Sequence, residues 1–85
     1  MENPEYYIYL LESLTDGIWY VGLSANPDER LKQHNRGKSK FTKGHVPWKL
    51  LYQEKIGNLK EARIKEKYYK TAAGKRRLKK LLNRD

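Results

Sequence analysis

The stretch YYIYLLESLTDGIWYVG, residues 6–22, decides the fold of this chain. Residues 6–12 and 18–23 are rich in Tyr, Ile, Leu, Trp and Val, the residue types that favour β-strands. Between them lie Asp16 and Gly17, a pair that suits a tight chain reversal. The pattern therefore predicts a β-hairpin.

Alternation along the two strands sorts the side chains of this hairpin onto two faces. Opposed residues of an antiparallel pair share a face, and successive residues alternate between faces. Whether the reversal is a two-residue turn or a four-residue loop, one face carries Tyr7, Tyr9, Leu11, Ile18, Tyr20 and Gly22. The other face carries Tyr6, Ile8, Leu10, Trp19 and Val21, which we assign to ordinary packing. Tyr9 and Tyr20 therefore belong to one surface.

A helix follows the hairpin. Asn26 can cap its first free amides, Pro27 fits the first helical position, and Glu29 completes an Asn-x-x-Glu capping box. Gly37 can end the helix. We predict a helix over residues 27–35.

The second half of the chain predicts one more strand and two more helices. Residues 36–47 have no sustained periodicity and indicate a loop with a basic surface, whereas residues 48–54 are typical of a strand. A second capping-box pattern, NLKE, opens a helix over residues 58–73, which Gly74 can end. The tail KRRLKKLL, residues 75–82, predicts a further short helix. The element order is β-β-α-β-α-α, which indicates an α+β fold.

Length and composition exclude several classes of protein. A chain of 85 residues supports one compact core, so we predict a single domain over residues 1–85. The absence of cysteine excludes a disulfide framework and a thiolate metal site, and it favours an intracellular, cytoplasmic location. Nothing before residue 30 resembles a signal peptide, and no apolar run approaches the length of a membrane span. We expect a soluble protein.

The net charge of +9 is unevenly distributed. Residues 1–29 hold six acidic and no basic side chains, whereas all 19 Lys and Arg residues lie in residues 30–85. This asymmetry indicates a surface that faces a polyanion, although lysines also serve to keep a small domain soluble. The basic residues suited to contact phosphates without reading bases are Arg36, Lys38, Lys40 and Lys43 in the loop, and Lys75, Arg76, Arg77, Lys79 and Lys80 in the tail.

Five side chains are candidates for chemistry. Arg30 and His34 are four residues apart, so they share one side of a helix and could clamp a phosphate or form a solvated flank. Glu66 falls in the inward stripe of its helix, where a carboxylate needs a hydrogen bond, an ion pair or a cation. Tyr9 and Tyr20 are ordinary sheet aromatics unless a cation or a donor stabilises a phenolate.

These residues carry a family resemblance. YIY, ten intervening residues and YVG, followed by NPDERLKQHN, FTKGHVPWKLLYQE and EARIKE, resemble the GIY-YIG nuclease superfamily, specifically its small single-domain members. The resemblance runs from about residue 6 to residue 82. Tyr7 stands where the motif has glycine, and Val21 replaces isoleucine.

The resemblance implies a three-stranded antiparallel sheet flanked by helices and a metal-dependent endonuclease that hydrolyses DNA phosphodiester bonds. It implies catalytic roles for Tyr9, Tyr20, Arg30 and His34, and a metal-binding role for Glu66, with Mg²⁺ or Mn²⁺ as the cofactor. One carboxylate suggests one ion. Arg30 would neutralise charge on the phosphoryl group, and the proton of the attacking water would go to Tyr9, Tyr20 or His34.

Two further features of the site follow. Gly22 would let the backbone pass close to the substrate, and Tyr7 lies on the site face, where its bulk bears on the shape of the site. We expect Tyr9, Tyr20, Arg30, His34 and Glu66 to line one accessible concavity.

Two other functions fit the same composition. A noncatalytic nucleic-acid-binding module would retain the fold and the basic surface without cleaving, and a small basic RNA-associated or scaffold protein would share the charge asymmetry. The partner expected of the enzyme is DNA, with no membrane, and a protein partner could supply target specificity.

Overall fold

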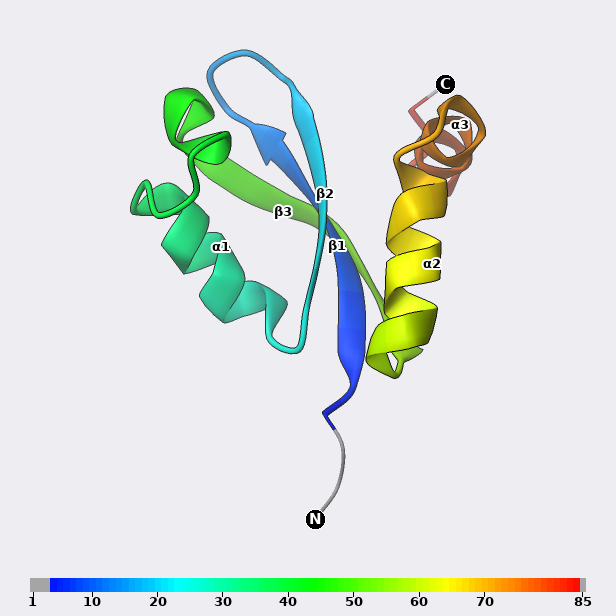
Figure 1. Ribbon diagram of the computed structural model, residues 1–85. Coiled ribbons are helices and arrows are strands. Elements are labelled where there is room, and N and C mark those ends of the chain that lie inside the picture. The colour runs from blue at the N-terminus through cyan, green and yellow to red at the C-terminus, as the bar shows by residue number, and fades with distance from the viewer. Residues whose placement is uncertain (1–3, 85) are drawn as a thin grey trace.

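The computed structural model describes residues 4–84 and has the predicted element order (Figure 1). The strands are β1 (Tyr6–Ser13), β2 (Trp19–Ser24) and β3 (Trp48–Gly57), and the helices are α1 (Pro27–Asn35), the 3₁₀ helix η1 (Thr42–His45), α2 (Leu59–Tyr69) and α3 (Ala72–Leu81). The strands form one antiparallel sheet in the order β2-β1-β3. Helix α1 lies on one face of this sheet, and α2 and α3 lie on the other. The predicted α+β fold with a flanked three-stranded sheet is confirmed.

The hairpin has the predicted faces. Tyr9 is opposite Gly22 and Leu11 is opposite Tyr20, so these four residues share one face. The Ser13 amide donates to the Ile18 carbonyl at 2.9 Å and closes a four-residue loop. Gly17 in that loop has φ +74°, a conformation that glycine adopts without strain.

Strand β1 is the central strand, and its side chains feed two separate cores. On the face covered by α1, called the α1 face below, the core consists of Tyr9, Leu11 and Trp48, with Tyr20, Leu31, Val46 and Leu50 packed against them. On the face covered by α2 and α3, called the α2 face, the buried core consists of Ile8, Leu10, Val21, Tyr69 and Leu78. Residues 8–11 are all buried, because consecutive side chains enter different cores.

Helix α1 begins and ends where its sequence predicts. The Glu29 amide donates to Asn26 Oδ1 at 3.2 Å, as a cap requires. The Asn26 amide donates to Ser24 Oγ at 3.0 Å, so Ser24 takes the place that the capping box gives to the Glu29 side chain. Gly37, with φ +76°, follows the C-cap residue Arg36.

The second helix ends earlier than predicted. We expected it to run to Ala73 and to end at Gly74, but α2 ends at Tyr69, and Thr71 caps a new helix by accepting from the Gly74 amide at 3.0 Å. Gly74 is buried within the first turn of α3, where an added Cβ would lie 2.0 Å from the Tyr68 carbonyl oxygen. The prediction was wrong because this glycine permits close approach of two helices rather than a left-handed turn.

The predicted basic loop contains the short helix η1, and hydrogen bonds tie it to the sheet. Asn35, the last residue of α1, accepts from the Trp48 amide at 2.6 Å and donates through Nδ2 to the Trp48 carbonyl at 3.0 Å. The Trp48 indole donates to the Thr42 carbonyl at 2.9 Å. These bonds fix the end of α1 and the start of η1 against the first residue of β3.

Candidate active site

A chain of buried hydrogen bonds crosses the α1 face. The Tyr9 hydroxyl and His34 Nε2 are hydrogen-bonded at 2.9 Å, and His34 Nδ1 is hydrogen-bonded to Thr42 Oγ1 at 2.7 Å. Tyr9 is 1% exposed, and His34 and Thr42 are 0% exposed. The structure therefore brings together two of the predicted site residues and adds a third group, the Thr42 hydroxyl.

Each member of this chain is held by a different element. Tyr9 comes from the middle of β1, His34 from the last turn of α1 and Thr42 from the start of η1. Opposite Tyr9, Gly22 leaves the space that the phenol fills, since an added Cβ would lie 2.4 Å from Cζ and Oη of Tyr9. Gly22 therefore accommodates the phenol of Tyr9. The space beside its backbone, where we expected substrate, is filled by this side chain.

Tyr20 borders the buried chain on its solvent side. Its ring lies edge-on to the His34 ring with centroids 5.0 Å apart, and its centroid is 6.4 Å from that of Tyr9. The side chain is half-buried and also forms one wall of a pocket. Tyr20 thus contacts both the buried hydrogen bonds and the surface.

Burial and the charge of Arg30 together set the protonation states of Tyr9 and His34. Burial, and after it the positive charge of Arg30, lower the pKa of His34 to about 4. The pKa of Tyr9 is raised, first by burial and then by the neighbouring Tyr20 phenol, while Arg30 opposes the rise and Glu66 adds to it. At neutral pH His34 is therefore an uncharged imidazole and Tyr9 a protonated phenol.

Arg30 lies within electrostatic reach of both groups. Its guanidinium is half-buried on α1 and donates from Nη1 to Gln33 Oε1 at 2.8 Å. One residue thus holds the arginine side chain along its own helix. The remaining donors of the planar guanidinium suit a phosphate oxygen.

Glu66 lies at the margin of the inward stripe of α2. Ala62 and Tyr69 in that stripe are buried, whereas the Glu66 side chain is 23% exposed and its Oε2 accepts from Lys70 Nζ at 3.3 Å. The carboxylate of Glu66 thus meets a lysine, and its negative charge adds to the rise in the pKa of Tyr9.

At this site the protein offers a metal ion a single carboxylate, that of Glu66. Among residues 4–84, no group of three or more His, Asp or Glu side chains gathers as a ligand set. Mg²⁺ is commonly held by one or two carboxylates, retained waters and phosphates of the substrate. Glu66 fits that mode and does not supply a protein cage.

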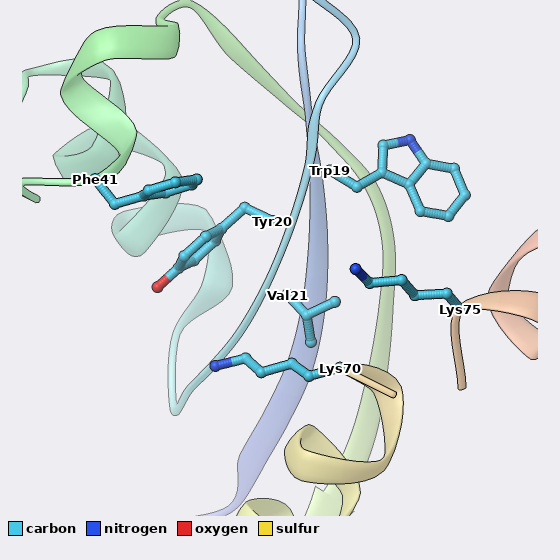
Figure 2. A pocket seen from close by; sticks show the side chains of 6 residues that line it. All are labelled: Trp19, Tyr20, Val21, Phe41, Lys70 and Lys75. Atoms are coloured by element: carbon cyan, nitrogen blue, oxygen red, sulfur yellow. The ribbon is translucent and has the colours of Figure 1, made fainter. Parts of the chain in front are cut away.

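The expected open concavity is not what the structure shows. Tyr9 and His34 are covered, because Tyr20 and the flanking elements pack over them. The accessible hollow beside them is a pocket of about 300 Å³ at the edge of β2, lined by Trp19, Tyr20, Val21, Phe41, Lys70 and Lys75 (Figure 2). Tyr20 is the one predicted catalytic residue among those that line it.

The predicted DNA-contacting side chains are exposed in two segments of the chain. Arg36, Lys38 and Lys40 are exposed between α1 and η1, and Lys43 is exposed within η1. Lys75 lines the pocket itself, and Arg76 lines a second hollow with Tyr68, Ala73, Arg77 and Lys80. Tyr7, which replaces the motif glycine, is half-buried opposite Ser24 on one side and Lys55 on the other.

Two side chains at the site were not predicted from the sequence. Thr42, which binds His34, and Phe41, which lines the pocket, both lie in the stretch assigned to a basic loop. Neither belongs to a periodic pattern. The available signal was local, because a single phenylalanine among lysines indicates a side chain with a purpose other than solubility.

Comparison with known proteins identifies the class that this fold and site define. The sequence profile of the GIY-YIG catalytic domain matches residues 5–81. The chain therefore belongs to the GIY-YIG family.

UPF0213 proteins are among the known proteins that this chain resembles. A UPF0213 protein of Bacillus licheniformis is 41% identical over 76 residues, which cover 88% of this chain and 77% of the relative. One from Streptococcus agalactiae is 40% identical over 75% of this chain and 73% of its own. The solution NMR structure of the UPF0213 protein BH0048 from Bacillus halodurans matches with a TM-score of 0.56 at 34% identity, covering 91% of this chain and 84% of that one.

Between residues 4 and 84, no helix is long and apolar enough to cross a membrane.

Proposed function

We propose that this GIY-YIG domain is a metal-dependent endonuclease that hydrolyses DNA phosphodiester bonds. The observation that supports the proposal is the buried Tyr9–His34–Thr42 chain with Arg30 beside it and Tyr20 over it. Ordinary packing does not require a neutral histidine bonded on both nitrogens between a phenol and a hydroxyl. General acid–base chemistry does require a proton acceptor that is held in one orientation.

The proton path in this proposal uses bonds that already exist. In the tautomer with hydrogen on Nδ1, His34 donates to Thr42 and accepts at Nε2 from the Tyr9 hydroxyl. When water attacks phosphorus, its proton passes to Tyr9 Oη as the phenolic proton passes to His34 Nε2. The P–O bond to the leaving oxygen breaks, and the leaving oxygen takes a proton from solvent water. The imidazolium, whose pKa is about 4, then gives its proton up to solvent. A free phenolate is never required, which agrees with the raised pKa of Tyr9.

Tyr9 is covered in the free protein, and the half-buried Tyr20 ring lies beside it. Catalytic contacts often tighten or open only once substrate is bound. In the proposal, Tyr20 separates the buried chain from the pocket, and binding of the strand moves it aside.

Two groups would neutralise the negative charge of the phosphoryl group, namely Arg30 and a metal ion held by Glu66. The Arg30 guanidinium would bind the oxygens of the phosphoryl group as negative charge builds there. Glu66 would hold one Mg²⁺ or Mn²⁺ ion, which when bound polarises a phosphate oxygen and stabilises the leaving oxygen. The exposed lysines and arginines of the segment that connects α1 to η1, of η1 and of α3 would hold the DNA backbone. The proposal includes a cytoplasmic location, and a protein partner as the source of target choice.

The test is a cleavage assay with labelled linear, flap and junction DNAs in Mg²⁺ or Mn²⁺. Glu66→Gln should abolish cleavage and leave DNA affinity in EDTA within about twofold, because the change removes one carboxylate charge and keeps the shape. Glu61→Gln, an exposed carboxylate on the same helix, is the matched control and should cleave normally. Equal background cleavage by the unmutated protein and by Glu66→Gln would refute the enzymatic proposal.

A second function has an observation of its own. Glu66 is already paired with Lys70, and Tyr9 and His34 are covered, as in a noncatalytic module that binds nucleic acid on the same basic surface. Such a module would bind DNA with a steep salt dependence and show no metal-dependent cleavage of any substrate in the panel. Lys70→Ala separates the two functions. It releases Glu66, and it should raise the apparent affinity of the enzyme for Mg²⁺, whereas a binding module would show only weaker DNA binding.

A further inference from the structure

The pocket at the edge of β2 has a composition that the chemistry above does not explain. Strand β2 is an edge strand, and the pocket wraps around that edge. Figure 2 shows the Phe41 and Tyr20 rings on one side of β2, the Trp19 ring on the other, and the Lys70 and Lys75 side chains reaching toward the strand from the α2–α3 side.

The aromatic wall of this pocket is exposed to solvent. Phe41 is 55% exposed, and its ring stacks on Tyr20 with centroids 6.0 Å apart and planes 27° apart. Trp19 is half-buried, with its indole nitrogen donating to Glu12 Oε2 at 3.1 Å, so the ring is held in place. Large rings that are fixed and left open to water are candidates for contact with another planar group.

The charged part of the pocket consists of two amines. Lys70 Nζ lies 3.3 Å from Glu66 Oε2, so this amine adjoins the candidate metal ligand, and Tyr20 adjoins the buried proton path. The pocket is thus continuous with the candidate site at two points. Aromatic rings that alternate with amines are complementary to a nucleotide, whose base stacks while its phosphate binds a cation.

We propose that this pocket binds an unpaired nucleotide of the DNA strand, with the base against Phe41 and the adjoining phosphates on Lys70 and Lys75. A volume of about 300 Å³ is at the lower end of the range for small-ligand pockets, which suits one base and excludes a base pair. In a duplex the faces of the bases are covered by their neighbours, so only an unpaired nucleotide offers a face to these rings. The inference rests on the proposed function and names its substrate class as DNA with unpaired nucleotides.

The test measures binding alone, in EDTA, so that cleavage plays no part. Two fluorescent probes are compared, an oligothymidylate of about twelve nucleotides and a strand of equal length and charge built from abasic residues. The unmutated protein should bind the oligothymidylate at least about fivefold more tightly, which corresponds to the stacking of one base. Phe41→Ala should remove this preference while the affinity for the abasic strand stays constant, and Phe41→Trp should retain it.

The two lysines have a different signature. Lys70→Ala and Lys75→Ala should weaken the binding of both probes by similar factors, and each should reduce the slope of log K against log salt by about 0.7. Lys60→Ala, at an exposed lysine at the start of α2 that is not part of the pocket wall, is the control and should leave the affinity for both probes and the salt slope nearly unchanged. Thermal melting of each variant verifies that it is folded.

The outcomes separate this inference from the proposed function. Equal binding of the two probes by the unmutated protein, or loss of affinity for both in Phe41→Ala, would overturn the pocket assignment even if DNA is cleaved. A base preference that depends on Phe41, in a protein that cleaves nothing, would support the pocket and refute the nuclease. Tighter binding of oligouridylate than of oligothymidylate would overturn the assignment to DNA.

Discussion

The central strand β1 contributes side chains to both faces of the sheet, and the two faces are chemically unlike. On the α2 face, β1 places Ile8 and Leu10 in an apolar core with Val21 and Leu78. On the α1 face, the next residue along, Tyr9, is hydrogen-bonded to a buried histidine. Alternation of side chains along β1 therefore assigns stability to one face and candidate chemistry to the other.

The difference shows how a small domain can bury polar groups. Apolar burial is non-directional and tolerates approximate packing, whereas a buried polar atom is costly unless it has a partner. Within residues 4–84 no buried side-chain nitrogen or oxygen lacks a hydrogen-bond partner. The α1 face meets this condition through bonds that fix its side chains, which is the property a proton path needs.

The largest expected effect is a loss of stability caused by a cavity in the core of the α2 face. Leu10→Ala should lower the free energy of unfolding by about 3 to 5 kcal/mol, because Leu10 is 1% exposed and the change leaves a cavity. Leu14→Ala, the same change at a side chain that is 58% exposed, should have an effect below about 0.5 kcal/mol. Urea denaturation measures both. A loss of DNA cleavage per folded molecule in Leu10→Ala would contradict the division between the two faces.

The next effect falls on chemistry and leaves stability almost intact. Arg30→Ala should reduce kcat about 100- to 1,000-fold, since one donor to the developing phosphoryl charge is removed. The melting temperature should change little, because Arg30 is half-buried and its guanidinium donates to Gln33 along its own helix. Arg63→Ala on the exposed side of α2 is the control. Unchanged single-turnover cleavage by Arg30→Ala would remove this residue from the mechanism.

The pH dependence of stability should originate on the α1 face. The pKa of His34 in the folded protein, about 4, lies below its ordinary value of about 6.5, so the folded state binds fewer protons than the unfolded state between these values. Stability should therefore fall as the pH is lowered from 6.5 toward 4, by at most about 3 kcal/mol. His34→Gln should flatten this slope in urea denaturation. Parallel slopes for the two proteins would show that His34 is not the group responsible.

The smallest expected effect comes from removing one hydroxyl on the α1 face, that of Thr42. Thr42→Val keeps the shape of the side chain and leaves His34 Nδ1 without its partner, so unfolding should become easier by about 1 to 2 kcal/mol. Thr42→Ser, which retains the hydroxyl, should lose less. A positioning role predicts more, namely that cleavage by Thr42→Val falls and its pH profile shifts while Thr42→Ser keeps the unmutated profile.

Much of the fold could be predicted because its signals are local. The Asp16–Gly17 reversal, the alternating side chains around it, and Asn26 with Pro27 at the start of a helix each depend on a few neighbouring residues. The break between α2 and α3 could not be placed from Gly74, since the surrounding sequence is helical on both sides. Thr71, a good cap residue, was the available local signal, and the contact of Gly74 with the Tyr68 backbone was not.

The candidate site was less predictable than the fold. Tyr9, Tyr20, Arg30, His34 and Glu66 could be named from their resemblance to a family. Their burial could not, because it depends on how α1 and η1 lie over the sheet. The open concavity expected for them was therefore wrong, and Tyr20 became the boundary between a buried chain and a pocket.

By itself, the sequence determined the order of the elements, the two faces of the hairpin and the positive charge of the second half, since each follows from short-range geometry or composition. Only the tertiary structure decided that Thr42 binds His34, that Gly22 makes room for the Tyr9 phenol, and that Phe41 and Lys70 line one pocket at the edge of β2. The physical reason is that each of these arrangements joins residues of different helices and strands, whose distances are set by packing rather than by any local preference.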